Sequence, residues 1–425
     1  MMIKKVFKFQ LDPDKKRLLE NFLSLSVLQG ANYILPLITL PYLVRVLGVE
    51  KFGLVMFSQS FVIFFNIFVD FGFNLFAVRE ISIYRDNKRK LTEIFSSIIL
   101  IKLILILISL FTLSIIIFTF DRFKNDKILY YSAFLMVIGQ ALIPIWYFQG
   151  LEKMKYITIV NVFSKLLFAI AIFIFVHHQN DYLLVPLLNG LGFIVGGILS
   201  LYLLYVKFHQ KFEWQNVNKL LYYFKKSSHF FLSRVANEGS HNYLTFILGI
   251  AFDSTIVGYY TMVERLYKAF YLGVQPLIQV IYPYMAKEKN VVFFKKIYVL
   301  ITVPFAIISI ILIVNANLIL NIIYGISNDV TYKLFLILFL SSVIGVTNAL
   351  IGYPLLGALG LTKEVNYSLV FGAIVAVTYV TICFLLKLNV FYYVFSVFLY
   401  ELISTFYRLY YVKDIMFKED SLCKH

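Results

Sequence analysis

Long apolar segments separated by short polar ones run through all 425 residues of the chain. A helix needs about 20 apolar residues to cross the hydrocarbon core of a bilayer. By that length the pattern predicts twelve spans, at residues 22–46, 53–83, 94–120, 128–150, 156–177, 182–206, 228–251, 256–285, 293–323, 330–357, 365–387 and 389–412. We therefore expect an all-α integral membrane protein of about twelve transmembrane helices.

One polar segment divides these spans into two sets of six. Residues 207–227 are basic and amphipathic, and they join the sixth span to the seventh. Lysine and arginine accumulate in cytoplasmic loops, and their bias between alternate loops places both termini inside. The expected parts are a cytoplasmic N-terminal segment, 1–21, an N-terminal six-helix bundle, 22–206, a cytoplasmic connection, 207–227, a C-terminal six-helix bundle, 228–412, and a cytoplasmic tail, 413–425.

The composition agrees with a lipid environment. Hydrophobic residues make up 60% of the chain and charged residues 15%, whereas soluble domains are about half apolar and about a quarter charged. A net charge of +16 would suggest nucleic acid as the partner of a soluble protein. Here the cations stand in short loops between apolar segments, so we expect a lipid bilayer and no nucleic acid. The two cysteines, Cys383 and Cys423, suggest no disulfide framework.

The two halves of the chain echo each other. Asn32-Tyr33 precedes a segment around Gly53, and Asn242-Tyr243 precedes a similar segment around Gly258, 205 positions later. Ala141-Leu142-Ile143 recurs as Ala349-Leu350-Ile351, 208 positions later. Similar offsets indicate a duplicated six-helix unit, and an even number of crossings makes the copies parallel. Carriers built in this way place their substrate in a central cavity between the two bundles.

The sequence contains no signature of a soluble enzyme. There is no phosphate-binding Walker loop, no Cys-x-x-Cys, no His-Glu-x-x-His and no Gly-x-Ser-x-Gly. His177-His178 stands beside Asp181 in a predicted outer loop, where a solvated loop is a better interpretation than a metal site. We therefore expect neither an enzyme, nor a metal, nor an organic cofactor.

Ionisable residues inside the predicted spans are the main candidates for function. Each costs about 2.5–3.5 kcal/mol at the centre of a membrane helix, so they should face a bundle interior or a wet cavity. They are Arg45, Asp70, Arg79, Glu80, Lys102 and Lys165 in the first half, and Arg234, Glu238, Glu264, Arg265, Lys268, Lys333 and Glu401 in the second.

Spacing places some of these residues on shared helix faces. Arg234, Glu238 and His241 recur at helical spacing, and Glu264 stands four residues before Lys268. The two helices are neighbours in sequence and could line a common cleft, where a cationic excess would suit an anion, phosphate in particular. The candidate phosphate contacts from this spacing are Arg234, Arg265 and Lys268. The alternative is that each glutamate neutralises its neighbour as a structural pair.

Acidic residues in the spans are candidates for binding a coupling cation, H+ or Na+. Asp70 lies deepest in its span and is followed by Gly72, where we expect a break in the helix. Glu264 and Glu238 are the other two candidates. Lys102 and Lys333 stand near predicted span ends, where a long side chain reaching the interface is a simpler interpretation. The same alternative applies to Arg45.

Three stretches together resemble Wzx-type flippases for O-antigen and capsule repeat units. These form the polysaccharide transporter branch of the multidrug/oligosaccharidyl-lipid/polysaccharide exporter superfamily. The resemblance is densest over residues 30–170, and a Val257-Gly258-Tyr259-Tyr260 element adds a weaker signal in the second half. The stretches are Leu35-Pro36-Leu37-Ile38-Thr39-Leu40-Pro41-Tyr42-Leu43-Val44-Arg45-Val46-Leu47-Gly48, Asp70-Phe71-Gly72-Phe73-Asn74 continuing to Arg79-Glu80-Ile81, and Trp146-Tyr147-Phe148-Gln149-Gly150-Leu151-Glu152-Lys153-Met154.

The resemblance implies a function as well as a fold. It implies two six-helix bundles around a central cavity in a bacterial inner membrane. It also implies export of an undecaprenyl-pyrophosphate-linked oligosaccharide to the periplasmic leaflet, beside a polysaccharide polymerase and a chain-length regulator. In such proteins intramembrane cations attract the pyrophosphate, and Arg45 and Arg79 lie inside the matching stretches. Lys165 completes the expected substrate-binding set, with Arg234, Arg265 and Lys268.

Two other functions compete with this prediction. A drug or cation antiporter of the same superfamily would favour an acidic, apolar pocket, whereas the ionisable residues inside these spans are mostly basic. A membrane polymerase or glycosyltransferase usually carries a sizeable extramembrane loop with catalytic residues. The longest connection here is the basic segment 207–227, which is too short for that.

Overall fold

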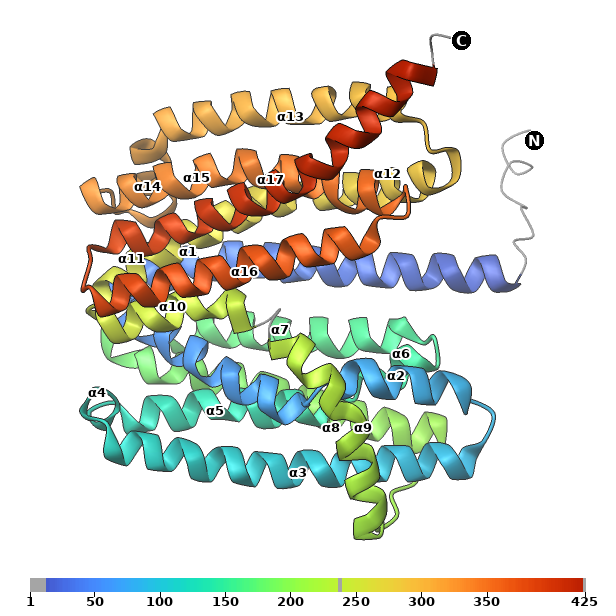
Figure 1. Ribbon diagram of the computed structural model, residues 1–425. Coiled ribbons are helices and arrows are strands. Elements are labelled where there is room, and N and C mark those ends of the chain that lie inside the picture. The colour runs from blue at the N-terminus through green and yellow to red at the C-terminus, as the bar shows by residue number, and fades with distance from the viewer. Residues whose placement is uncertain (1–12, 236–238, 423–425) are drawn as a thin grey trace, which may run out of the picture. The chain divides into compact units, whose positions relative to one another are not determined.

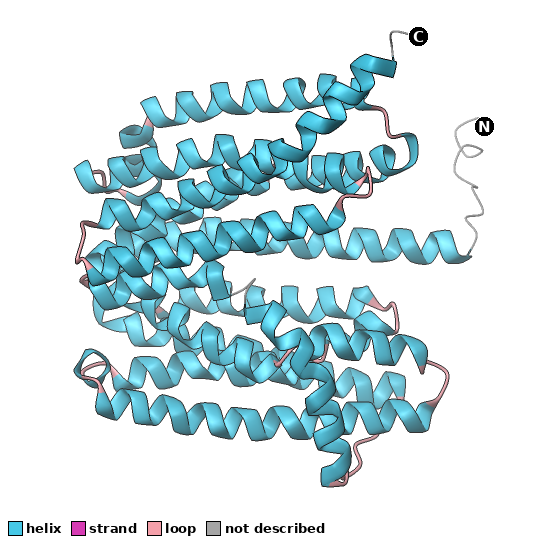
Figure 2. Cartoon of the chain, in the orientation of Figure 1, coloured by secondary structure: helices cyan, strands magenta, loops and turns pink. Residues whose placement is uncertain are grey.

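The computed structural model describes residues 13–235 and 239–422, and all the regular structure in these ranges is helical (Figures 1 and 2). The helices of the first half are α1(Pro13–Asp70), α2(Phe73–Ile83), α3(Lys88–Thr119), α4(Asp121–Lys124), α5(Lys127–Leu142), α6(Ile145–Gly150), α7(Met154–Phe175), η2(Gln179–Leu183) and α8(Leu184–Phe208). Those that follow are α9(Val217–Arg234), α10(Ser240–Ala251), α11(Ser254–Leu272), α12(Gln275–Glu288), α13(Val291–Val314), α14(Ala316–Tyr324), α15(Asp329–Leu350), η4(Ile351–Gly357), α16(Thr362–Leu385) and α17(Val390–Leu422).

Nine segments in the described ranges are long and apolar enough to span a membrane. Their abundance confirms the prediction of an all-α multi-pass membrane protein. This count by length and apolar character falls short of the twelve predicted spans, partly because the first predicted span and most of the second form one helix. That helix, α1, is kinked at Gly48, which adopts a φ of 73°. α1 ends at Asp70, as expected from Gly72, so the second predicted span continues as the separate helix α2.

The described residues form two compact units that do not coincide with the two halves of the sequence. The first unit holds the residues up to Thr39, Val62–His177 and Leu183–Arg234. The second holds Leu40–Phe61, His178–Tyr182 and the residues from Val235 onward. The middle of α1 thus belongs with the C-terminal helices. The six-plus-six bundle boundaries given above stay a prediction.

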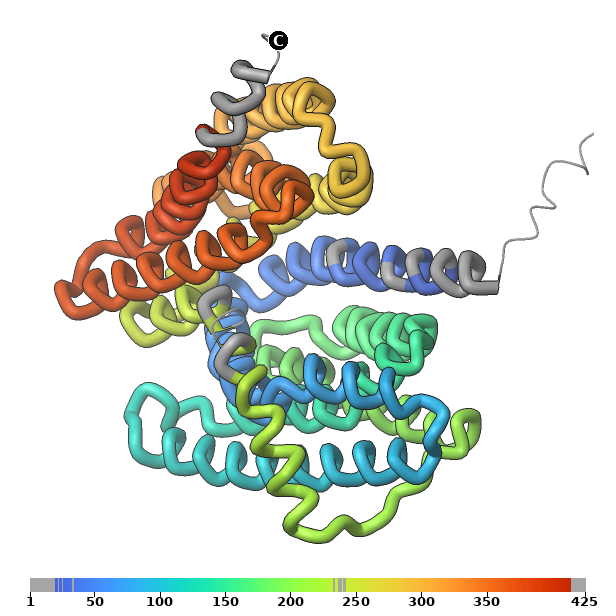
Figure 3. Tube along the Cα trace, turned by 45° about the vertical axis from the view of Figure 1, so that its right-hand side comes forward, coloured from blue at the N-terminus to red at the C-terminus, as the bar shows by residue number. Residues whose placement is uncertain are grey.

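Helix pairs build each unit. In the first unit α8 packs against α5 and α7, α2 packs against α6, and α9 packs on α3 and α2. Figure 3 shows the yellow-green α9 running across these blue and teal helices. In the second unit α17 packs against α15 and α16, and α15 packs against α11 and α13. Its core includes the fully buried Met285, Leu350 and Leu356.

Glycines allow two helices of the second unit to touch. A Cβ atom on Gly53 of α1 would lie 1.8 Å from the backbone oxygen of Ser254 in α11. A Cβ atom on Gly258 would lie 2.4 Å from the backbone oxygen of Val49. These are the two glycines that the sequence repeat pairs, so repeat-related positions pack against each other.

Helix boundaries support the same repeat. α5 ends at Leu142 and α15 at Leu350, while α7 begins at Met154 and α16 at Thr362. Each pair is 208 positions apart, the offset of the alanine–leucine–isoleucine echo. A short irregular turn or helix, α6 in one half and η4 in the other, follows each break.

Candidate functional site

A polar pocket of about 200 Å³ lies inside the first unit. It is lined by the end of α1 and the start of α2, together with residues of α3, α5, α6, α7, α8 and α9. Unlike the apolar helix faces around it, it presents charged and amide side chains. They are Asn66, Asp70, Asn74, Lys102, Gln140, Asn161, Lys165 and Arg234.

Asp70 stands at the centre of the charges in this pocket. Its Oδ1 lies 3.0 Å from Lys102 Nζ, and its Oδ2 lies 2.9 Å from Arg234 Nη1. Asp70 is 6% exposed and Lys102 3%. A carboxylate this deeply buried needs cationic partners to remain ionised, and two helices provide one each.

Gly72 explains how α9 comes close enough to deliver Arg234. Its φ of 77° is left-handed, a conformation that glycine adopts without strain. A Cβ atom at this position would also lie 2.8 Å from Phe230 Cβ and from the Phe231 backbone nitrogen. Next to it, the Phe71 ring stacks between Phe224 and Phe231, with centroids at 4.2 and 4.7 Å.

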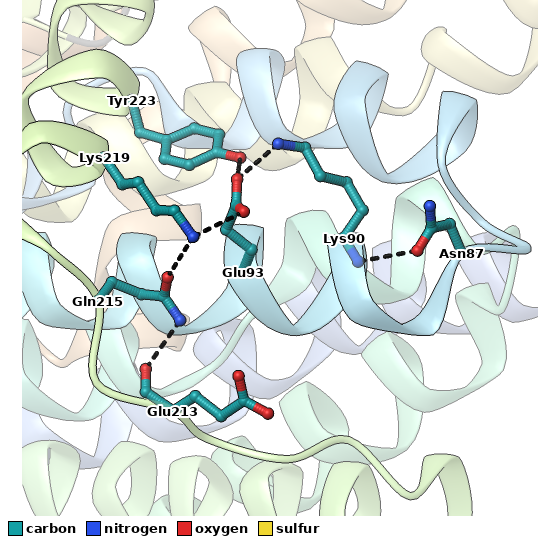
Figure 4. A network of polar contacts seen from close by, with 7 residues as sticks. All are labelled: Asn87, Lys90, Glu93, Glu213, Gln215, Lys219 and Tyr223. Atoms are coloured by element: carbon teal, nitrogen blue, oxygen red, sulfur yellow. Dashed lines mark hydrogen bonds and ion pairs between the residues drawn. The ribbon is translucent and has the colours of Figure 1, made fainter.

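A second polar network ties the other end of α9 to α3 (Figure 4). Glu93 forms ion pairs with Lys90 (Oε1 to Nζ, 2.5 Å) and with Lys219 (Oε2 to Nζ, 2.9 Å). The Tyr223 hydroxyl donates a hydrogen bond to Glu93 Oε1 at 2.9 Å. Burial raises the pKa of Tyr223 well above its ordinary value, so the hydroxyl stays a proton donor. Lys219 also donates to Gln215. The helix that carries Arg234 is therefore fixed at both ends.

Amide side chains line the rest of the first pocket. Asn66 Nδ2 donates to Gln140 Oε1 at 2.7 Å, and Lys165 Nζ donates to Asn32 Oδ1. Lys102, Lys165 and Arg234 face a single lining carboxylate, so the described lining residues carry a net positive charge. Such a pocket suits an oxyanion, because arginine and lysine offer charge-assisted donors.

A larger cavity of about 490 Å³ lies inside the second unit. Six tyrosines from α10, α11, α17 and η4 line much of it: Tyr243, Tyr260, Tyr267, Tyr271, Tyr353 and Tyr400. Lys268 Nζ pairs with Glu264 Oε1 at 2.7 Å, and the Tyr260 hydroxyl donates to the same oxygen at 3.4 Å. This pairing agrees with the structural alternative for Glu264 and Lys268.

α17 contributes a buried glutamate and a buried arginine to the same cavity. Glu401 is 5% exposed and Arg408 3%. Arg408 Nε donates to Ser368 Oγ at 2.8 Å, and its Nη1 donates to the backbone oxygen of Asn348. Asn348 Nδ2 donates to Glu401 Oε2 at 2.8 Å. Asn348 thus joins the two ionisable groups.

Comparison with known proteins places this geometry in a family. Residues 18–289 match the family described as "Polysaccharide biosynthesis protein". The chain belongs to that family. Within the chain, the match covers every residue that lines the first pocket, but it ends before Asn348, Glu401 and Arg408.

Two curated relatives in sequence are each named "Putative O-antigen transporter". The protein from Escherichia coli (strain K12) is 31% identical over 74% of this chain and 77% of its own length. The protein from Shigella dysenteriae is 28% identical over 63% of this chain and 67% of its own. Both names describe transporters, in agreement with the expectation that this member of the polysaccharide biosynthesis family is not an enzyme.

Solved structures share the fold at low sequence identity. The lipid II flippase MurJ in an inward closed conformation has a TM-score of 0.67 at 16% identity, over 92% of this chain and 87% of its own. An inward-facing multidrug resistance transporter of the MATE family has a TM-score of 0.65 at 15% identity, over 94% and 99%. The fold of this family member is therefore that of the MurJ and MATE transporters.

The structure brings together some of the predicted site residues of this family member. Lys165, Arg234 and Asp70 share the first pocket, while Glu264 and Lys268 line the second. Arg234 therefore lines a different pocket from the α11 residues with which the sequence grouped it.

The remaining predicted residues lie elsewhere. Arg45 donates to the backbone oxygen of Ile322, and Arg79 is exposed on α2. Arg265 is partly buried, and its Nε has no hydrogen-bond partner among the described residues. Glu238 lies outside the described residues, so its predicted role stays a prediction.

Two outcomes differ from sequence reasoning. The expectation that Lys102 reaches the membrane interface is wrong, because it is buried against Asp70. Arg408 and Asn348 were not singled out, although Arg408 lies inside the predicted span 389–412; Asn348 is uncharged and so was not a candidate ionisable residue. Glu401 and Arg408 are seven residues apart on one helix, a spacing that puts both on one face and could have identified the pair.

Proposed function

We propose that this protein is a flippase that carries an undecaprenyl-pyrophosphate-linked oligosaccharide repeat unit across the bacterial inner membrane. The product would serve O-antigen or capsular polysaccharide synthesis. Family membership and the names of the curated relatives support a polysaccharide transporter. The fold shared with a lipid II flippase supports movement of a lipid-linked sugar.

The observation that carries the proposal is the cationic pocket of the first unit. Three basic side chains face one carboxylate in about 200 Å³, and asparagine and glutamine side chains supply further donors. Pyrophosphate is anionic and rich in acceptors, so the pocket offers it charge and hydrogen bonds together. Of the predicted contacts, Lys165 and Arg234 meet this description best, while Arg45, Arg79, Arg265 and Lys268 remain candidates for other stages of passage.

The proposed mechanism is alternating access. The head group enters sideways from the inner leaflet, the prenyl tail stays in lipid, and the protein then opens to the outside. Moving one elementary charge through the membrane potential is worth about 2.3 kcal/mol per 100 mV, so an inside-negative potential favours export of the anion. H+ or Na+ coupling at Asp70, Glu264 or Glu238 is a further part of the proposal.

The proposed setting follows from the loop charges. Both termini and the 207–227 connection are cytoplasmic by the positive-inside rule. A polysaccharide polymerase and a chain-length regulator are the proposed partners, because an exported repeat unit must be joined to others before it reaches the surface.

Neutralising the pocket tests the proposal. In cells that depend on this protein for surface polysaccharide, Lys165→Gln with Arg234→Gln should lower export at least about tenfold, a loss of about 1.4 kcal/mol. Arg234→Lys, which keeps the charge, should lose less. Lys333→Gln is the matched control, because Lys333 is an exposed lysine that pairs with Asp329.

The readout is surface polysaccharide at matched protein level. Full export by the doubly neutralised protein would remove the pocket from the substrate path. A drug antiporter would have the same fold, so dye efflux from the same cells separates the two functions. Efflux without polysaccharide export would favour the antiporter.

A further inference from the structure

Two buried glutamates line the second-unit cavity, and their surroundings differ. Glu264 and Glu401 are each 5% exposed. Glu264 has an ion pair with Lys268 at 2.7 Å. For Glu401 the structure gives no ion pair within 4.0 Å among the residues it describes. Carboxyl groups in unlike surroundings of this kind commonly take different protonation states.

Within the described ranges Glu401 has one close hydrogen-bond donor, and that donor is neutral. Asn348 Nδ2 reaches its Oε2 at 2.8 Å. Arg408, two turns further along α17, directs its donors to Ser368 Oγ and to the Asn348 backbone oxygen. The carboxyl group is thus held in place without a direct cation, and an ionised carboxylate is costly in such a site.

The free side of the Asn348 amide completes the site. Asn348 is 3% exposed, it lines the cavity, and its Oδ1 has no hydrogen-bond partner among the residues that the structure describes. A carboxamide has two donors on nitrogen and an acceptor on oxygen. Its NH₂ group can donate a hydrogen bond to an ionised Glu401. If the amide group flips by 180°, its oxygen can accept a hydrogen bond from a protonated Glu401.

We propose that Glu401 is a reversible proton-binding site, with Asn348 as the residue that positions it in both states. A proton from water in the cavity adds to a Glu401 oxygen, and the neutral acid then donates that proton in a hydrogen bond to Asn348 Oδ1. Release returns the proton to water. No other bond is made or broken.

The charges around the cavity favour a proton over a metal cation. The titratable groups that share it with Glu401 are Tyr260, Glu264, Tyr267, Lys268 and Tyr271 of α11, Tyr400 and Arg408 of α17, Tyr353 of η4 and Tyr243 of α10. Two of these are cations that repel a metal ion. No group of three or more histidine, cysteine or acidic residues suited to a metal occurs in the described part of the chain.

Protonation changes the charge of the cavity. With both glutamates ionised, Lys268 and Arg408 balance them. When Glu401 takes up a proton, the lining becomes positive by one unit. The link from this change to transport rests on the proposed function, in which an anion crosses the membrane, but the binding of the proton does not.

Infrared difference spectra of the purified full chain in lipid nanodiscs, between alkaline and acidic buffer, test the proton site. We expect a carboxylic-acid carbonyl band that is absent from Glu401→Gln and retained in Glu264→Gln, the matched buried glutamate. Asn348→Leu should shift the band, because the neutral acid loses its hydrogen-bond partner. A band that persists in Glu401→Gln, or that disappears in Glu264→Gln, would overturn the assignment.

Export measurements separate this inference from the proposed function. If polysaccharide export by the wild type varies with external pH, Glu401→Gln should flatten that profile, whereas Lys333→Gln, the control at an exposed ion pair, should keep its shape. If the protein exports no polysaccharide but shows the Glu401 band, the proposed flippase function is contradicted and the proton-binding site is supported. If polysaccharide is exported but the Glu401 band is absent, the proton-binding site is contradicted and the flippase function is supported.

Discussion

Asp70 is the residue through which α1 is held to α3 and α9. Lys102 and Arg234 reach it from these two helices, at 3.0 and 2.9 Å. In a low-dielectric interior the two cations depend on this one carboxylate, because removing it leaves both without their shared counter-charge.

Asp70→Asn should therefore destabilise the protein strongly. It leaves the buried Lys102 and the partly buried Arg234 as neighbouring like charges without their carboxylate, and the loss of a buried partner costs about 3–5 kcal/mol. Adding Lys102→Met should restore much of the loss, since it removes one of these charges. The measurement is the denaturation midpoint of the purified protein in detergent.

The control for this experiment is Asp329→Asn, which breaks an exposed pair with Lys333. A surface pair of this kind contributes at most about 1 kcal/mol. If Asp70→Asn and Asp329→Asn shift the midpoint equally, the buried cluster does not stabilise the fold.

At the residue scale, the sequence predicted the environment of Asp70 correctly but that of Lys102 wrongly. The depth of Asp70 in its span identified it correctly as buried, because a carboxylate in the middle of an apolar helix needs a special site. Distance to a span end misjudged Lys102, since that distance does not tell which side of the helix a residue faces. Arg408 was missed although it lies inside the predicted span 389–412.

At the scale of elements, close helix contacts depend on glycines, which have no side chain to keep the helices apart. Gly53 and Gly258 bring α1 and α11 together, and Gly249 leaves room for the Phe57 ring, which a Cβ atom would meet at 2.0 Å. The sequence repeat drew attention to the first two glycines. It could not tell that they touch, because a repeat relates positions without giving distances.

Gly258→Val should prevent stable packing of α11. A Cβ atom already lies 2.4 Å from the Val49 oxygen and 2.6 Å from its side chain, and backbone cannot yield as a flexible side chain can. We expect little folded protein in the membrane fraction by size-exclusion fluorescence. Gly30→Ala is the control, because nothing lies within 4 Å of its Cβ position and alanine favours a helix by about 1 kcal/mol. Normal yields of Gly258→Val would contradict the contact.

At the scale of the whole molecule, the apolar pattern predicted the membrane fold and most helix positions. It did not predict that α1 is one kinked helix, because Gly48 and the polar pair Glu50-Lys51 indicated a loop between two spans, whereas the helix continues through them. Nor could it assign Leu40–Phe61 to the second unit, since that depends on long-range packing.

The proposed orientation can be tested by labelling single cysteines in intact cells. Asn125, after α4, and Asp86, before α3, are both exposed. On a background without Cys383 and Cys423, Asn125→Cys should react with a membrane-impermeant maleimide from outside. Asp86→Cys should react only after permeabilisation, because the loop charges place it in the cytoplasm. The opposite pattern would reverse the assigned topology.

The place of Leu40–Phe61 has a consequence for how the protein is made. This segment leaves the ribosome about 180 residues before α10 and α11, against which it finally packs. At synthesis rates of about 5–20 residues per second, it waits roughly 10–40 s in the membrane without them. During that interval the surface around Gly53 and Phe57 faces lipid or an insertion chaperone. A chain released early would keep that surface exposed, and membrane proteases that survey unfinished products could recognise it there.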